Sequence, residues 1–188
     1  MPKLPLPNPH IHTLAPYQPG KSAISLQAEL GRPIVQLANN ENPLGASQSV
    51  AAVLQNAMQQ IHLYPDGEYQ TLKALLANKL GVQASQITLG NGSENILELI
   101  IKSFLPAKAN AVISEYTFLT IPILIKSYNA NTIIAPTNNF HTDTHAMLQA
   151  INTETRMIFL VNPNNPTGTY TTTDDLLFFL KSVPSDIV

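Results

Sequence analysis

The chain has 188 residues, of which 44% are hydrophobic and 12% charged, and its formal net charge is −2. This composition favours a globular protein with a hydrophobic core and excludes a disordered chain. The charge offers no basic surface for nucleic acid or an anionic membrane, and the lack of cysteine excludes disulfides and thiolate metal sites. No apolar run is long enough to cross a bilayer, and the N-terminus has no signal-peptide core, so we expect a cytoplasmic protein.

The first half of the chain is predicted to hold an extended arm and then two helices. Six prolines within residues 1–20 disfavour regular helix or central strand in that segment. Residues 47–61 place apolar side chains at helical spacing, which predicts an amphipathic helix. After a Tyr-Pro-Asp-Gly turn at 64–67, a second helix carries leucines on one face and stops at Gly81.

Strand and helix patterns alternate from residue 86 onward. The expected strands are 86–89, 111–114, 131–135, 156–161 and the start of another at 186–188. The expected helices are 94–104, 117–128, a short helix capped by Asp143 and ending near 151, and 173–183. This alternation predicts an α/β fold with a mostly parallel sheet and crossover helices.

A glycine-rich turn at 90–93 joins a predicted strand to a predicted helix. Free backbone N–H groups and the helix dipole at such a helix start favour a bound phosphate. The same residues fit an ordinary tight turn in which Ser93 caps the helix, because a lone Gly-x-Gly is a weak signal. A nucleotide-binding α/β domain that uses this turn is therefore one alternative.

A rigid turn, Asn-Pro-Asn-Asn-Pro-Thr-Gly at 162–168, follows the apolar run 157–161. Each proline fixes its own φ and restrains the residue before it. Such a turn can hold one hydrogen-bonding side chain at the carboxyl edge of the sheet, where open α/β proteins bind ligands. Phe118, after the strand 111–114, is suited to stack on a flat ring, although an ordinary core aromatic is the alternative.

These motifs together resemble, in content and order, the fold-type I pyridoxal-phosphate aminotransferases. The 162–168 turn is similar to that family's Asn-Pro-x-Asn-Pro-Thr-Gly signature. This resemblance implies that Asn165 hydrogen-bonds the phenolic oxygen of pyridoxal 5′-phosphate and that the peptide bond after it is cis. It also implies that the backbone N–H groups of Gly92, Ser93 and Glu94 bind the cofactor phosphate. The Glu94 carboxylate should then point away from that phosphate.

Further matches extend the resemblance to the ring and to a second subunit. The Glu-Tyr-Thr-Phe segment at 115–118 matches a family segment whose last aromatic stacks on the pyridine ring, which implies that role for Phe118. Tyr116 stands where the family usually has proline, so the local turn departs from the family pattern. The turn at 64–67, otherwise a surface turn, matches one that crosses a dimer interface. It implies a homodimer in which Tyr64 reaches the phosphate in the partner's site.

Two N-terminal segments, 16–21 and 37–45, look like those of histidinol-phosphate aminotransferases. The resemblance implies that Tyr17 and Asn40 face the substrate. It implies amino transfer between histidinol phosphate and 2-oxoglutarate, giving imidazole-acetol phosphate and glutamate, in histidine biosynthesis. Another fold-type I aminotransferase or a threonine-phosphate decarboxylase remains an alternative, because these enzymes share several of the motifs.

The resemblance implies two chemical partners of the cofactor, a Schiff-base lysine and a carboxylate at the pyridine nitrogen. Neither is found in the chain. None of the lysines has Ser or Thr three residues before it, so the Ser/Thr-x-x-Lys motif of the Schiff-base lysine is missing. We therefore expect no catalytic residue and an N-terminal fragment that is inactive alone. Its predicted domains are residues 1–45, the arm and the start of a small domain, and 46–188, a truncated pyridoxal-phosphate-binding large domain. A non-catalytic binding or dimerisation module is the alternative. The histidines at 141 and 145 lack a zinc-protease glutamate, and no metal site is expected.

Overall fold

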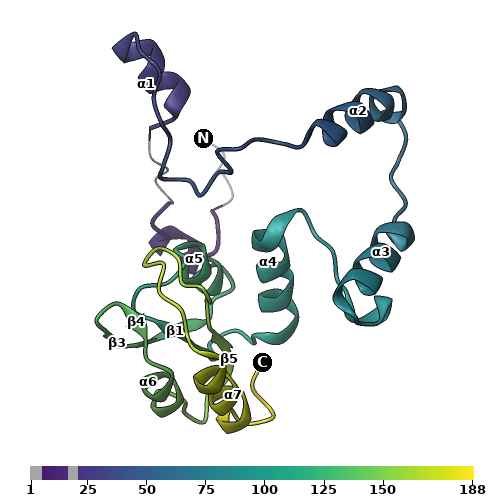
Figure 1. Cartoon of the computed structure of the whole chain (residues 1–188). Helices are drawn as coiled ribbons and strands as arrows, with labels where there is room; N and C mark the ends of the chain where they lie inside the picture. Colours follow the sequence, from purple (N-terminus) through teal and green to yellow (C-terminus); the bar gives the residue numbers. More distant parts are fainter. Residues whose placement is uncertain (1–5, 17–20) are drawn as a thin grey trace, which may run out of the picture. The chain divides into compact units, whose positions relative to one another are not determined.

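The computed structural model describes residues 6–16 and 21–188, and Figure 1 follows the chain through them. The chain divides into two compact units, one formed by residues 1–17 and 90–188 and the other by residues 18–89. The domain boundary expected between residues 45 and 46 stays a prediction. Within the described ranges, no helix has both the length and the apolar character that crossing a membrane would require.

A parallel three-stranded sheet forms the centre of the first unit. Its strands are β1 (Asn110–Ser114), β2 (Asn131–Ala135) and β5 (Thr155–Phe159), in the order β2-β1-β5. At the end of the chain, the Val188 N–H donates to Arg156 O (3.0 Å) and the Ile158 N–H donates to Val188 O (2.8 Å). This is the bonding of a parallel neighbour. The predicted parallel sheet is therefore confirmed, and the expected last strand begins to pair beside β5.

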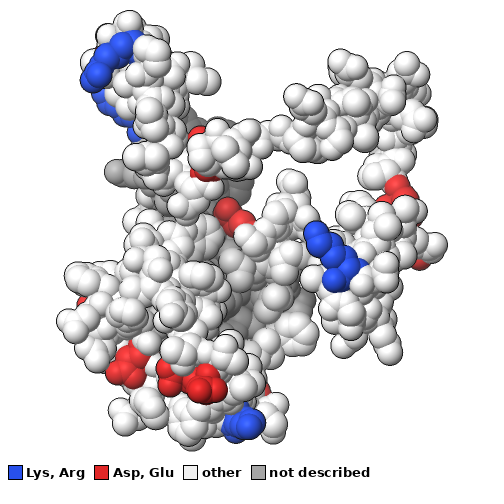
Figure 2. All heavy atoms as spheres, in the orientation of Figure 1, with Lys and Arg blue, Asp and Glu red and all other residues white. Residues whose placement is uncertain are grey.

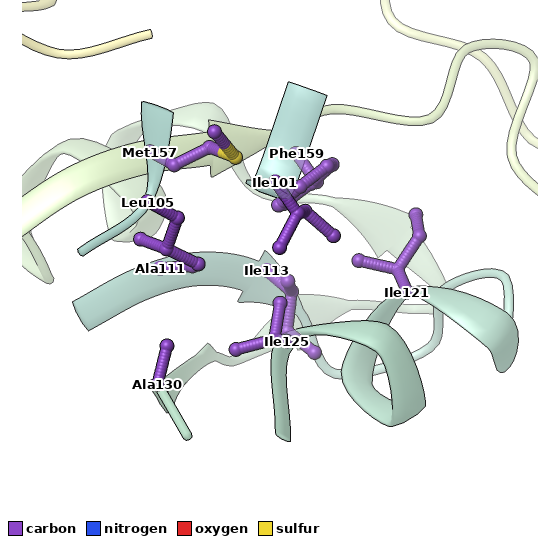
Figure 3. Packing of buried hydrophobic residues seen from close by; sticks show 9 residues of the cluster. All are labelled: Ile101, Leu105, Ala111, Ile113, Ile121, Ile125, Ala130, Met157 and Phe159. Carbon is purple, nitrogen blue, oxygen red and sulfur yellow. The ribbon is translucent and has the colours of Figure 1, made fainter. Parts of the chain in front are cut away.

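Helices cover both faces of this sheet. One face packs on α4 (Gly92–Phe104) and α5 (Thr120–Ser127), and the other on α6 (Thr144–Gln149) and α7 (Thr173–Ser182). Figure 3 shows nine residues of the first core: Ile101, Leu105, Ala111, Ile113, Ile121, Ile125, Ala130, Met157 and Phe159. Their burial contributes about 1.5–3 kcal/mol for each large side chain.

Strand β1 serves both cores because its side chains alternate between the two faces. Ala111 and Ile113 belong to the core under α4 and α5, whereas Val112 packs with Met147 and Phe179 of α6 and α7. All five residues of β1 are buried. The central position of this strand fixes where its carboxyl end lies, and with it the segment that follows.

Local sequence signals account for several helix ends. Asp143 caps α6 as predicted, since its Oδ1 accepts a hydrogen bond from the Ala146 N–H (2.9 Å). Thr172 caps α7 in the same way through the Asp175 N–H (3.2 Å). Acidic side chains gather over α6 and α7 in Figure 2, and a basic side chain lies beside them.

A short antiparallel hairpin follows β2, made of β3 (Thr137–Asn138) and β4 (His141–Thr142). The two residues of its turn, Asn139 and Phe140, both have positive φ, 47° and 65°. A two-residue hairpin turn of type I′ requires positive φ at both residues, and Asn-Gly is its usual sequence. The Asn-Phe pair gave no such signal, so the hairpin was not predicted.

The sequence predicts an extended proline-rich arm, but part of this arm is helical. Residues Pro9–Thr13 form the 3-10 helix η1, with proline at the start, where its missing N–H costs nothing. The His10 Nε2–H donates to Ser127 O (3.1 Å) and Lys126 Nζ donates to Thr13 O (2.7 Å), so η1 docks on the end of α5. At the residue after α5, the pKa of Tyr128 is raised above the ordinary tyrosine value. Partial burial is the larger cause, and the hydrogen bond to Glu98 is the second.

The second unit is mostly helical. It contains α1 (Ala23–Leu30), α2 (Gln48–Ala57), η2 (Met58–Gln60), α3 (Gln70–Leu80) and η3 (Ala84–Gln86). The two predicted helices correspond to α2 and α3, and α3 ends at Gly81 with φ 68° as expected. The predicted strand at 86–89 is wrong: Gln86 ends η3, and residues 87–89 have no partner strand among the described residues.

Candidate functional site

A cavity of about 520 Å³ lies at the carboxyl edge of the sheet in the first unit. Its lining residues are Ser93, Ile96, Leu97, Phe118, Ile121, Phe159, Leu160, Val161 and Asn165. Three of the predicted site residues, Ser93, Phe118 and Asn165, are thus brought together from segments that are far apart in the sequence. Apolar walls with a few polar groups are typical of small-molecule sites. Since no lining side chain is acidic or basic, this cavity can bind and orient a ligand but supplies no acid or base.

The start of α4 lies at this cavity, where Ser93 is a lining residue, whereas the predicted Gly92 and Glu94 are not among the lining residues. No side chain of the described residues caps the helix, whose first residue, Gly92, has φ 81°. The Gly92 N–H donates to Gly90 O (2.9 Å), whereas Ser93 and Glu94 are the second and third helical residues. N–H groups at these positions have no partner within a helix. Ser93 and Glu94 therefore offer two donors for an anion.

Gly90 lets the backbone approach the first turn of α4 closely. A Cβ at this position would lie 2.7 Å from Ile96 Cδ1 and 2.8 Å from Asn95 Oδ1. The Asn95 Oδ1 accepts a hydrogen bond from the Asn91 N–H (3.1 Å), which fixes the turn. The packing around the helix start therefore favours glycine at this position, which fits the expected tight turn.

Phe118 both packs on the core and lines the cavity. It lies against the core cluster under α4 and α5 and is half-buried. Tyr116, two residues earlier, packs instead on Phe140 of the hairpin, with ring centroids 5.3 Å apart. The two aromatics of this loop therefore lie in different surroundings, and only Phe118 is among the cavity residues.

The three asparagines of the 162–168 turn have different surroundings. Asn162 bonds the backbone of Thr171, accepting from its N–H (2.8 Å) and donating to its carbonyl (3.4 Å). Asn164 is buried and donates to Tyr116 O (2.9 Å). Asn165 alone lines the cavity. The Asn165–Pro166 bond is cis, as the resemblance implies, and so is Asn162–Pro163.

The remaining predicted residues lie elsewhere in the chain. Tyr64 and Asn40 belong to the unit of residues 18–89, where Tyr64 is 100% exposed and Asn40 has φ 55°. Tyr17 lies outside the described residues. The roles of these three residues stay predictions.

Sequence reasoning missed the apolar walls of the cavity. Ile96 and Leu97 follow Ser93 by three and four residues, so all three share one face of α4. This spacing could have identified them once Ser93 was a candidate. Val161 belongs to the apolar run before the 162–168 turn and extends the wall toward Asn165.

Comparisons with known proteins agree with this architecture. The family model for aminotransferase class I and II matches residues 32–186. A histidinol-phosphate aminotransferase 2 of Pseudomonas fluorescens is 43% identical over 188 residues, which is 98% of this chain and 51% of that protein. The protein of the same name from Methylococcus capsulatus is 44% identical over 187 residues, covering 96% of this chain and 50% of that protein.

A solved structure matches to the same extent. The histidinol-phosphate aminotransferase of Sinorhizobium meliloti, crystallised in complex with pyridoxal-5′-phosphate, superposes with a TM-score of 0.85 at 25% identity. The match covers 96% of this chain and 48% of that one. The fold is therefore the α/β fold of the pyridoxal-phosphate aminotransferases. The chain belongs to the class I and II aminotransferase family, and it spans about half the length of the curated relatives it matches.

Proposed function

We propose that this chain provides the cofactor-binding part of a pyridoxal-phosphate-dependent histidinol-phosphate aminotransferase. The observation that carries the proposal is the meeting of Ser93, Phe118 and Asn165 at one cavity. The relatives with 43–44% identity carry the name of this activity, which supports the choice of substrate. We propose histidinol phosphate as amino donor and 2-oxoglutarate as acceptor, and a cytoplasmic location, which the absence of cysteine fits.

The described residues fit the cofactor at three points. The uncapped start of α4 would bind the phosphate through the N–H groups of Ser93 and Glu94, aided by the helix dipole. The face of Phe118 would pack on the pyridine ring, which has the flat shape that aromatic stacking needs. The Asn165 side chain, which has no hydrogen bond to a described residue, would donate to the phenolic oxygen.

When bound, pyridoxal phosphate acts as an electron sink that stabilises negative charge at the carbon bearing the substrate's amino group. The residues of this chain would bind the cofactor and fix its orientation. The proton-transferring lysine expected of the family is not among the lysines of these 188 residues, as judged by its motif. Tyr17 and Asn40 are proposed to contact the substrate.

We also propose that two copies share each site, with Tyr64 of the partner subunit bonding the cofactor phosphate. The full exposure of Tyr64 leaves its hydroxyl free to reach another molecule. In such a dimer, each cofactor would contact Asn165 of one subunit and Tyr64 of the other. This arrangement can be tested by mixing subunits.

The test uses the whole protein encoded by the gene and follows glutamate formation from histidinol phosphate and 2-oxoglutarate. Wild-type protein should be active, and Asn165→Ala and Tyr64→Ala homodimers should each be strongly impaired. Hybrid dimers that pair an Asn165→Ala subunit with a Tyr64→Ala subunit should recover one intact site. Each such dimer should therefore show a substantial part of the wild-type rate. Absence of the activity in wild-type protein would refute the proposed reaction, while hybrids as impaired as their parents would refute the shared site.

A further inference from the structure

A chain of hydrogen bonds connects the 162–168 turn to two other segments of the first unit. Asn164 Nδ2 donates to Tyr116 O (2.9 Å) in the loop after β1 and also to Thr167 Oγ1 (2.8 Å). Thr167 Oγ1 lies 2.8 Å from Thr169 Oγ1, which donates to Phe140 O (3.1 Å) in the turn of the hairpin. The chain thus runs from the loop that carries Phe118, through the turn that carries Asn165, to the β3–β4 hairpin.

The direction of every bond in this chain is fixed by its two ends. Phe140 O is a carbonyl and only accepts, so the single proton of the Thr169 hydroxyl is used there. The contact between the two hydroxyls then requires the Thr167 hydroxyl to donate. Thr167 can therefore only accept from Asn164, whose NH₂ group supplies both remaining protons. One arrangement of donors satisfies all four contacts, and it also determines the orientation of the Asn164 amide.

The surroundings of Asn164 indicate that its donated bonds are the reason for its place in the turn. The residue is 5% exposed, and its Oδ1 is buried without a partner among the described residues. A buried amide oxygen without a partner is costly, so this side chain is held there for its donors. Its backbone is also bonded inside the turn, from its own N–H to Thr169 O (2.7 Å) and from Gly168 N–H to its carbonyl (2.8 Å).

The hairpin at the far end of the chain is itself anchored. Glu115 Oε2 accepts a hydrogen bond from Thr137 Oγ1 (3.0 Å), which joins β3 to the residue after β1. The ring of Phe140 packs on that of Tyr116 at 5.3 Å. The hairpin is therefore a fixed support. The hydrogen bonds that join it to the 162–168 turn through Thr169, Thr167 and Asn164, here called the tether, restrain that turn.

We infer that Asn164, Thr167 and Thr169 are positioning residues, which hold Asn165 and Phe118 at a fixed separation across the cavity. The inference rests on the proposed cofactor site, since it assigns the purpose of the tether to that site. Asn165 directly follows the tethered Asn164, and Phe118 lies two residues after the Tyr116 carbonyl. Breaking the chain should let the two cofactor-contacting groups move apart without removing either.

Thr169→Val removes the hydroxyl while keeping the branched shape, and Thr169→Ser restores it. Thr171→Val is the matched control, because the Thr171 hydroxyl makes no hydrogen bond in the part of the chain that the structure describes. Two quantities are measured on the whole protein encoded by the gene. One is the Kd for pyridoxal phosphate by equilibrium dialysis, and the other is amide hydrogen exchange of segments 116–118 and 162–169 without cofactor.

Thr169→Val should raise the Kd roughly tenfold, which corresponds to about 1.4 kcal/mol, and should speed exchange in both segments. Thr169→Ser and Thr171→Val should match the wild-type protein in both measurements. A Thr169→Val protein that loses thermal stability but keeps the wild-type Kd and exchange in 116–118 would overturn the inference. Should Thr169→Val fail to fold, Thr167→Val breaks the same chain at its middle link, and the same results are required of it.

The two proposals can fail separately. If the wild-type protein binds no pyridoxal phosphate, the proposed function is wrong, and the assigned purpose of the tether falls with it. If the wild-type protein binds the cofactor but Thr169→Val and Thr171→Val bind it equally well, the positioning role of the tether is refuted and the proposed function stands. Exchange in the cofactor-free protein reports on the tether in either case.

Discussion

At the scale of single residues, two aromatic side chains of the same loop have different surroundings. Phe118 lines the cavity, while Tyr116 in the same loop packs on the hairpin. If Phe118 stacks on the cofactor ring, Phe118→Leu should raise the Kd for pyridoxal phosphate about two- to tenfold, because aromatic stacking contributes about 0.5–1.5 kcal/mol. Phe104→Leu, at the exposed end of α4, should leave the Kd unchanged. Equal Kd values for the two variants would exclude Phe118 from the site.

The sequence was sufficient to identify Asn165 as a candidate site residue, but it did not predict the hydrogen bonds of Asn164. The motif and its resemblance singled out one amide of the turn. Asn164 acquires its surroundings from Tyr116, which is 48 residues away in the sequence, and no local pattern reports such a contact. Phe118 was ambiguous between a core aromatic and a ligand contact, and the structure gives it features of both.

At the scale of elements, the close approach of Gly90 to α4 controls the start of that helix. Gly90→Ala would put a Cβ 2.7 Å from Ile96 Cδ1 and 2.8 Å from Asn95 Oδ1, and would disturb the bond from the Asn91 N–H. We expect a loss of about 1 kcal/mol in unfolding free energy, near the low end for overpacking, because the atoms met are side-chain ends.

Gly67→Ala is the matched control for this change. A Cβ at Gly67 would meet nothing within 4 Å, and the backbone of Gly67 is not in the left-handed region. Denaturant unfolding of the two variants measures the difference. If Gly90→Ala unfolds at the wild-type midpoint, α4 does not need the close approach, and the glycine has no packing role in the turn.

Strands with an apolar run could be predicted from the sequence, whereas elements that depend on a neighbouring strand or on an unusual backbone conformation could not. Strands β1, β2 and β5 were found within a few residues because their apolar runs and flanking turns are strong signals. The segment 86–89 alternates polar and apolar residues as a strand does, but it has no neighbouring strand among the described residues and forms no ladder. The β3–β4 hairpin depends on positive φ at Asn139 and Phe140, for which the sequence carries no typical signal.

At the scale of the whole molecule, the chain comprises two units, and the candidate cavity belongs to only one of them. The unit of residues 1–17 and 90–188 has two buried cores that fix the carboxyl edge of the sheet. In the other unit, α2 and α3 have no buried residues. Cofactor binding is therefore expected to depend first on the unit that contains the sheet.

The decisive measurement is the Kd for pyridoxal phosphate of the whole protein encoded by the gene, compared among wild type, Asn165→Ala and Asn78→Ala. Asn78 is an exposed asparagine of α3 and serves as the control. We predict saturable binding that Asn165→Ala weakens roughly tenfold to a hundredfold, since a hydrogen bond to a charged group contributes about 1.5–3 kcal/mol, and that Asn78→Ala leaves unchanged. No saturable binding, or equal Kd values for the two variants, would contradict the assignment of this cavity to the cofactor.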